Sequence, residues 1–368
     1  MMSVSKRGTA MLLCAAALPT FTPAVHAIDD PGDVPLSKRI LRKEAVVKAS
    51  PADAWHAWTT SEGIASFFSK ESMIELRIGG PYELYMGGSE PDAAGKRGSQ
   101  GCKILSYIPQ RMLAFEWNFP PKLKSLRESG AKTQVVLRFD DLGDGRVRVR
   151  FAQLGWQDGD DWQAGYEYFE EAWDWVMSQF EQKIGGGDTP DRRSPVDQRR
   201  GSDVKKSWVD GHLRVTATYG AQQSQSFEME IPVPVEKVWN AIATEDGFRV
   251  LGAAEPRIEL RPDGAYRFWP QAPNKVLAFV PQEMLSTSGS APPEFPNVRK
   301  GGSWSAYELE AGRAGSTRLV LTCLGWRPGE KEWDDAFEYF LKSNPVFLNQ
   351  LYDKLVGERR LSHVDAGE

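Results

Sequence analysis

The chain has 368 residues, two to three times the length of a common single domain, so more than one compact unit is expected. Hydrophobic residues make up 41% of it, enough to build packed cores, yet no window holds the roughly 18 apolar residues that a membrane-spanning helix needs. The 45 basic residues nearly balance the 50 acidic residues, and this mildly acidic charge argues against nucleic acid as a general partner.

The N-terminal segment has the features of a secretory signal peptide. Lys6 and Arg7 precede an apolar, alanine-rich run at 8–18, and the small residues of the sequence VHA at 25–27 suit cleavage after Ala27. We therefore expect residues 1–27 to be removed and the protein to be exported, either into a periplasm or out of the cell. The alternative interpretation is a buried or interfacial N-terminal helix.

After this segment the chain carries the same pattern twice. The stretch KILSYIPQRML at 103–113 matches KVLAFVPQEML at 275–285 at six of eleven positions, and three- and four-residue matches occur in the same order on either side. We therefore predict two copies of one domain. The predicted ranges are a first copy at 43–184, a linker rich in glycine, proline and charge at 185–207, a divergent second copy at 208–356, and a tail at 357–368.

The first copy is predicted to be an α+β domain. Residues 45–49 indicate a short strand, and Ser50 followed by Pro51 indicates a helix start, because the hydroxyl can cap the helix while proline needs no donor there. Alternating apolar residues then predict an antiparallel sheet with one covered face. The alternation covers 74–78, 82–86, 115–119, 135–139 and 147–151.

The last helix of the first copy is predicted to cover this sheet. Its apolar residues recur at three- and four-residue steps and form one stripe. The stripe consists of Trp162, Tyr166, Phe169, Trp173, Val176, Met177 and Phe180. It is wide enough to lie across the concave face of a curled sheet.

These motifs resemble a known superfamily. The sequences SPADAW at 50–55, FF at 67–68, GG at 79–80, IPQR at 108–111, FEW at 115–117 and LGW at 154–156 are similar to the SRPBCC (START-like) superfamily. More narrowly, they resemble its AHSA-like branch, named after an activator of a heat-shock chaperone ATPase. The resemblance covers nearly all of 43–184 and, more weakly, 226–356. It implies two tandem helix-grip domains, each a curved antiparallel sheet wrapped around a long C-terminal helix, with room for a cavity between them. Members of the superfamily include lipid and hormone carriers, polyketide cyclases and co-chaperones.

The second copy departs from this pattern. Where the first copy has FEWNF at 115–119, the second has TSGSA at 287–291, which cannot place large aromatic rings over a pocket. In its last helix, Pro345 is expected to kink the helix or to restart it with Asn344 as the cap. Ligand chemistry predicted for the first copy is therefore not carried over to the second.

Motifs for catalysis, metal or cofactor binding are missing from the sequence. After cleavage only His56, His212 and His363 remain, and no two of them have metal-ligand spacing. Nucleophile-elbow, Walker and dinucleotide patterns are absent as well. We predict no catalytic residue, no metal site and no cofactor. Cys102 and Cys323 lie at non-equivalent places in the two copies, so they do not indicate a disulfide framework, and whether they pair stays open.

Polar residues that interrupt the apolar faces are candidate ligand contacts. The strand alternation places Gln153 inward, at the position where the second copy has Cys323. Glu170 lies at the edge of the helix stripe, where a buried carboxylate would need a partner, a raised pKa or a polar ligand. The alternatives are a satisfied amide for Gln153 and a solvent-facing Glu170. Likewise, the aromatic rings could line a cavity or simply fill it. The predicted ligand-binding set is Tyr82, Met86, Trp117, Gln153, Tyr166, Phe169, Glu170 and Trp173.

Three functions follow from this pattern. The leading hypothesis is an exported tandem protein that binds a small apolar or amphipathic ligand in its first copy. The second is a protein-interaction or co-chaperone-like module whose partner the sequence does not name. The third is a cyclase or hydrolase that uses an inward acid such as Glu170. A cavity of at least about 300 Å³ in the first copy favours the first hypothesis, and a solid interior with an exposed apolar patch favours the second.

Overall fold

The computed structural model describes residues 34–87, 90–185, 201–209, 212–220, 224–270 and 274–357. The predicted signal segment at 1–27 lies outside the described residues. The same holds for residues 186–200 of the predicted linker and for the tail beyond Gly357. Among the helices that are described, none combines the length and the apolar character that crossing a bilayer requires.

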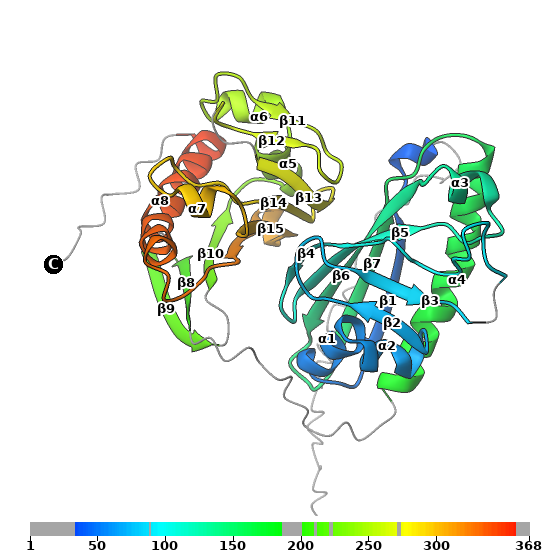
Figure 1. Cartoon of the computed structure of the whole chain (residues 1–368). Helices are drawn as coiled ribbons and strands as arrows, with labels where there is room; N and C mark the ends of the chain where they lie inside the picture. The colour runs from blue at the N-terminus through cyan, green and yellow to red at the C-terminus, as the bar shows by residue number, and fades with distance from the viewer. Residues whose placement is uncertain are drawn as a thin grey trace, which may run out of the picture. The chain divides into compact units, whose positions relative to one another are not determined.

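The first copy is an antiparallel sheet closed by one long helix, α4 (Asp160–Ile184). In spatial order the sheet consists of β1 (Leu41–Val47), β7 (Val147–Leu154), β6 (Lys132–Asp141), β5 (Met112–Asn118) and β4 (Ile104–Ile108). Between β1 and β4 the chain forms α1 (Pro51–Thr59), α2 (Ser61–Phe67) and a ribbon of β2 (Glu71–Ile74) with β3 (Tyr82–Tyr85). The shorter helices η1 (Leu36–Lys38) and α3 (Lys124–Glu128) complete the copy. Figure 1 shows α4 in green beside the strands of this sheet.

The buried face of α4 contains five of the seven residues of the predicted stripe, and the other two, Trp162 and Tyr166, are half-buried. The buried residues of the helix are Gly165, Phe169, Trp173, Val176, Met177, Phe180 and Ile184. The ring of Trp173, 1% exposed, lies 4.5 Å from Phe151 on β7 and 5.2 Å from Trp117 on β5, whereas Trp175 is 56% exposed. The helix therefore packs on the sheet through the face that the sequence predicts, and the predicted helix-grip arrangement is confirmed.

The helix start at Ser50 is also confirmed. The Ser50 hydroxyl accepts a hydrogen bond from the Asp53 backbone N–H at 3.1 Å, and Pro51 is the first helical residue. This geometry is the N-cap arrangement that the sequence predicts, since proline costs no donor at the first position.

The predicted strand at 74–78 is wrong beyond its first residue. β2 covers Glu71–Ile74, and the chain then folds on itself, because the Arg77 N–H donates to the Glu75 carbonyl at 2.7 Å and the Gly80 N–H to the Arg77 carbonyl at 2.9 Å. Alternate apolar side chains in this stretch still pack partly buried against the core. The alternation therefore reported burial correctly, although the backbone hydrogen bonds are those of turns.

The second copy repeats this order of elements with a larger sheet. Its strands in spatial order are β11 (Arg257–Ile258), β12 (Ala265–Arg267), β13 (Asn274–Val280), β14 (Met284–Ser288), β15 (Trp304–Ala311), β16 (Thr317–Leu324) and β10 (Ser224–Ile231). Its helices are α5 (Val235–Ala243), α6 (Glu245–Val250), α7 (Pro296–Arg299), η2 (Arg313–Gly315) and α8 (Lys331–Val356). Beyond β10 the sheet continues into β8 (Gly201–Val209), which pairs parallel to β10, and β9 (His212–Gly220). β8 thus begins inside the range 185–207 that composition assigns to a linker.

A buried tyrosine shows how closely the two copies correspond. The Tyr82 hydroxyl on β3 donates to the Trp58 carbonyl at the end of α1 at 2.9 Å, and the Tyr266 hydroxyl on β12 donates to the Ile242 carbonyl at the end of α5 at 2.9 Å. In both copies the bond satisfies a buried hydroxyl and ties the first helix to the strand ribbon. The duplication therefore extends to individual hydrogen bonds.

The predicted restart of the last helix at Asn344 is wrong. α8 is one helix from Lys331 to Val356 with Pro345 inside it. The Asn344 side chain does not cap a helix: its amide nitrogen lies 3.5 Å from the Gln225 side-chain oxygen and 3.5 Å from the Cys323 sulfur. Fully buried Leu348, one turn further on, packs on the core of the second copy. Tertiary packing of this kind can outweigh the local cost of a proline.

Candidate ligand-binding pocket

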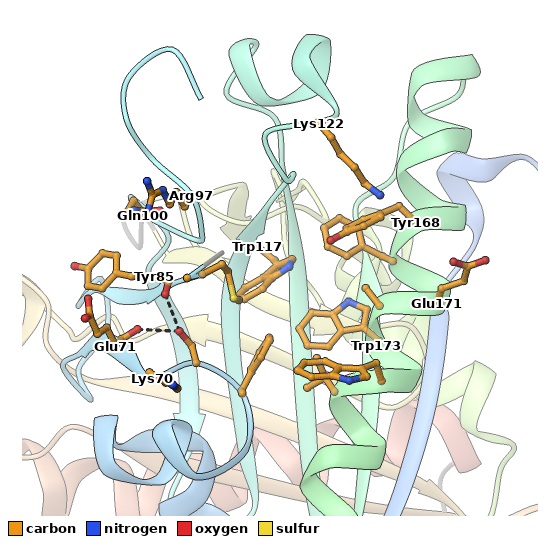
Figure 2. A pocket seen from close by; sticks show the side chains of 18 of the residues that line it. Lys70, Glu71, Tyr85, Arg97, Gln100, Trp117, Lys122, Tyr168, Glu171 and Trp173 are labelled. Carbon is orange, nitrogen blue, oxygen red and sulfur yellow. Dashed lines mark hydrogen bonds between the residues drawn. The ribbon is translucent and has the colours of Figure 1, made fainter. Parts of the chain in front are cut away.

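A pocket of about 920 Å³ lies in the first copy between α4 and the strands. Its lining comes from the end of α2, from β2, β3 and β5, from the loop between β3 and β4, and from the middle of α4. Figure 2 shows Trp117, Tyr168 and Trp173 on one side of the pocket and Glu71, Tyr85, Arg97 and Gln100 on the other. The lining has an apolar part and a charged part.

The apolar side is a set of touching rings that we call the aromatic floor. It consists of Phe68, Trp117, Phe169 and Trp173. The ring of Phe68 lies 5.8 Å from Trp117 and 5.7 Å from Trp173, and the two indoles are 5.2 Å apart. Because these rings come from three separate elements, only the folded domain assembles the floor. Such a surface suits a flat or lipidic apolar group.

Charged side chains lie around the edge of the pocket on both of these sides, and we call them the charged rim. It consists of the exposed side chains of Lys70, Glu71, Arg97, Lys122 and Glu171. The Lys122 ammonium lies 4.0 Å from the centre of the Tyr168 ring and makes a cation–π contact there. Figure 2 shows the two side chains next to each other. With three cations and two carboxylates, the charged rim favours an anionic group over a cationic one.

A buried ion pair anchors the loop that carries Arg97. Asp92 Oδ2 accepts from Arg127 Nε at 2.8 Å, with the two side chains 13% and 5% exposed. Arg127 Nη1 also donates to the carbonyls of Gly98 and Phe119, both at 2.8 Å. The hydrogen bond from Arg127 holds the pKa of Asp92 below its usual range. The loop is thereby fixed against α3, which keeps one edge of the pocket in place.

Four of the eight predicted ligand-binding residues line this pocket. They are Met86, Trp117, Phe169 and Trp173. The other four, Tyr82, Gln153, Tyr166 and Glu170, lie elsewhere.

Gln153 and Tyr82 have structural hydrogen bonds. Fully buried Gln153 donates from Nε2 to Thr133 Oγ1 at 2.8 Å and accepts from Trp173 Nε1 at 2.8 Å. The satisfied-amide alternative therefore describes Gln153, which holds Trp173 of the aromatic floor in orientation. Tyr82 is fully buried outside the lining, where it stacks on Phe115 at 4.1 Å and donates its hydroxyl to the Trp58 carbonyl.

Tyr166 and Glu170 lie away from the pocket on α4. Half-buried Tyr166 packs against Trp156 with ring centres 5.1 Å apart. Glu170 is exposed, so the solvent-facing alternative describes it. Its position at the border of the stripe allows the carboxylate to reach water without cost.

The prediction missed a second stripe on α4. Tyr168, Ala172 and Trp175 line the pocket and follow one another at four- and three-residue steps, parallel to the core stripe. The available sequence signal is the spacing of Tyr168, Ala172 and Trp175, which places all three on one face of the helix. The structure adds that Trp175 is 56% exposed, which a stripe that only packs would not leave.

The described residues show no metal-binding cluster of three or more His, Cys, Asp or Glu side chains. His56 Nε2 lies 3.4 Å from the Thr60 hydroxyl within α1 and its cap, and the side chains of the other two histidines lie outside the described part. Cys102 and Cys323 are both free and buried. Burial raises the pKa of Cys102 to about 12 and that of Cys323 to about 11, so both thiols stay neutral and unreactive at physiological pH.

Comparison with solved structures gives similar proteins at low identity. The Aha1 dimer from Colwellia psychrerythraea is 18% identical, covering 41% of this chain and 99% of its own, with a TM-score of 0.31. A protein of Mesorhizobium loti is 18% identical, covering 41% of this chain and all of its own (100%), with a TM-score of 0.33. The di-domain ARO/CYC protein BexL from the BE-7585A biosynthetic pathway is 10% identical, covering 87% of this chain and 99% of its own, with a TM-score of 0.30.

A search of curated proteins finds no match to this chain. The family model described as "Activator of Hsp90 ATPase homolog 1-like protein" matches residues 48–185 and 232–351. These two segments make up more than half of the chain and coincide with its two helix-grip copies. The chain therefore belongs to the activator of Hsp90 ATPase homolog 1-like family of the SRPBCC superfamily, as two tandem domains.

Proposed function

We propose that the first copy binds a small amphipathic molecule, with the apolar body of the ligand on the aromatic floor and its polar end at the charged rim. The observation that carries this proposal is the pocket of about 920 Å³ that combines an aromatic floor with a charged rim. Its volume falls in the range of about 300–1,000 Å³ that is usual for small-molecule sites. If the aromatic rings of the first copy served only to pack the core, they would fill this space, because protein interiors are close-packed.

The two alternative functions fit the pocket less well. The enzyme hypothesis relied on an inward acid, but Glu170 is exposed and outside the lining. The interaction hypothesis expected a solid interior with an apolar patch on the surface, whereas exposed Trp175 belongs to the pocket itself. Both observations favour a ligand.

We further propose that the polar end of the ligand is anionic. Lys70, Arg97 and Lys122 approach the pocket from different elements, so an anionic group that lies at the charged rim meets more positive than negative charge. A long-chain carboxylate combines this charge with an apolar body. The fluorescent probe 11-(dansylamino)undecanoic acid has both features.

Filling the pocket is expected to abolish binding of this probe. Ala172 lies in the lining on α4, and the indole of Ala172→Trp would occupy the space beside the aromatic floor. Ala164→Trp is the matched control, since Ala164 is exposed on the same helix and outside the lining. Titration of the full chain, followed by dansyl emission, is expected to show saturable binding for wild type and for the control, and at least about tenfold weaker binding for Ala172→Trp. Equal affinity in both variants, or no saturable binding to wild type, would contradict the proposal.

We also propose that the protein is exported after loss of residues 1–27, on the strength of the charged, apolar and small-residue pattern of that segment. The intact mass of protein isolated from its own host is expected to match a chain that begins at Ile28. A full-length chain in the cytosolic fraction would contradict export.

A further inference from the structure

The second copy has a pocket of its own, although its sequence at 287–291 lacks the aromatic residues of the first copy. The pocket has a volume of about 650 Å³ and lies between α8 and the sheet. Its rings come from other elements, namely Phe248, Phe268, Trp269, Trp326, Phe340 and Phe347. The small residues at 287–291 thus leave space that is surrounded by rings from α6, from the segments that follow β12 and β16, and from α8.

The chemistry of this second pocket differs from that of the first. Of the described residues in its lining, only Arg299 carries a charge, whereas five charged side chains border the first pocket. The Cys323 thiol lies in the lining, 3.3 Å from the Ser305 hydroxyl, and burial raises its pKa to about 11, so it stays neutral. The interior therefore offers rings, hydroxyls and amides.

Two buried polar atoms in the lining have no hydrogen-bond partner in the described part of the chain. They are the side-chain oxygens Asn274 Oδ1 on β13 and Ser290 Oγ after β14. Buried polar groups are nearly always paired, because an unpaired one loses its hydrogen bonds to water and gains none in return. An amide oxygen accepts, so a ligand with an O–H or N–H group would satisfy Asn274.

We propose that the second copy binds a neutral aromatic molecule that donates a hydrogen bond to Asn274, at a site separate from the first pocket. This inference goes beyond the proposed function, because it gives the divergent copy a ligand class of its own. The aromatic walls select a ring, the unpaired oxygen selects a donor, and the near absence of charged side chains selects against an ionised ligand.

Three matched probes test the ligand class: 2-naphthol, naphthalene and 2-naphthoate. Isothermal titration calorimetry is carried out on the full chain with Ala172→Trp, which closes the first pocket. We expect 2-naphthol to bind about tenfold more tightly than naphthalene, which has no donor, and at least about tenfold more tightly than anionic 2-naphthoate. Tighter binding of 2-naphthoate, or no saturable binding of 2-naphthol, would overturn the proposal.

Two variants locate the site. Ser343→Trp places an indole in the lining from α8 and is expected to abolish 2-naphthol binding, whereas Lys342→Trp on the exposed side of the helix is expected to leave it unchanged. Asn274→Leu is expected to remove the preference for 2-naphthol over naphthalene, and this result stays decisive if Ser343→Trp does not fold, as judged by circular dichroism. An unchanged preference in Asn274→Leu would contradict the assignment.

The experiments on the two pockets can fail separately. If the first copy binds no dansyl probe while 2-naphthol binding depends on Ser343 and Asn274, only the proposed function fails. If the dansyl probe binds and depends on Ala172 while 2-naphthol does not bind, only the second site fails.

Discussion

Replacement of Trp173 by alanine is expected to lower the free energy of unfolding by about 3–5 kcal/mol. Trp173 is 1% exposed, its ring packs against Phe151 and Trp117, and its indole nitrogen donates to Gln153. The substitution therefore removes the contacts of the indole with both sheet residues and leaves a large cavity between α4 and the sheet. The measurement is urea-induced unfolding followed by far-UV circular dichroism.

The matched control lies two residues further along the same helix. Trp175 is 56% exposed, so Trp175→Ala is expected to change the free energy of unfolding by no more than about 0.5 kcal/mol. Equal destabilisation by the two variants would mean that α4 does not grip the sheet through the Trp173 face.

Gln153→Leu is expected to lower the free energy of unfolding by about 1–3 kcal/mol, although leucine has nearly the same side-chain volume as glutamine. The loss arises because the Trp173 Nε1–H is left buried without an acceptor and Thr133 Oγ1 loses a donor. Gln182→Leu, on the exposed side of α4, is the control and is expected to be near neutral.

A double-mutant cycle separates this hydrogen bond from packing. Trp173→Phe also breaks the bond, so once it is made, Gln153→Leu is expected to cost less than it does in the wild-type background. Additive free energies would contradict the role assigned to Gln153.

Both copies have a buried glutamine that bonds to the last helix, but the sequence does not reveal this shared feature. In the first copy Leu41 on β1 lies opposite Gln153 on β7, and in the second Gln225 on β10 lies opposite Cys323 on β16. The buried amide has thus moved to the neighbouring strand, where Gln225 Nε2 donates to the Phe337 carbonyl on α8 at 2.5 Å. Each copy ties its last helix to its sheet with one buried glutamine, but the two glutamines are not at aligned positions.

The sequence predicts the fold well because periodicity reports burial. The stripe on α4 and the cap at Ser50 were both readable, since each depends on spacing within one element. The strand predicted at 74–78 failed because alternate burial also occurs in the turns that precede Gly80, where hydrogen bonds are local. The restart predicted at Asn344 does not occur, because packing further along α8 outweighs the local effect of Pro345 on helix continuity.

The pocket was only half predictable, because a cavity is the space that several elements leave between them. Trp117 and Trp173 were identified from alternation and helical spacing. Lys70, Arg97 and Lys122 lie in connecting segments, where no periodicity marks which way a side chain points. The second pocket was not foreseen at all, since small residues at 287–291 leave space that only the neighbouring elements can turn into a cavity.

Native mass spectrometry of the full chain isolated from its own host tests the central claim most directly, because it detects a retained ligand without naming it. We expect a defined added mass on a polypeptide that begins at Ile28. That mass is expected to be lost from Ala172→Trp and retained by Ala164→Trp, with both variants made in the Ser343→Trp background so that the second pocket holds no ligand. A bare polypeptide mass for wild type, or an added mass that both variants keep equally, would contradict a ligand held between α4 and the sheet of the first copy.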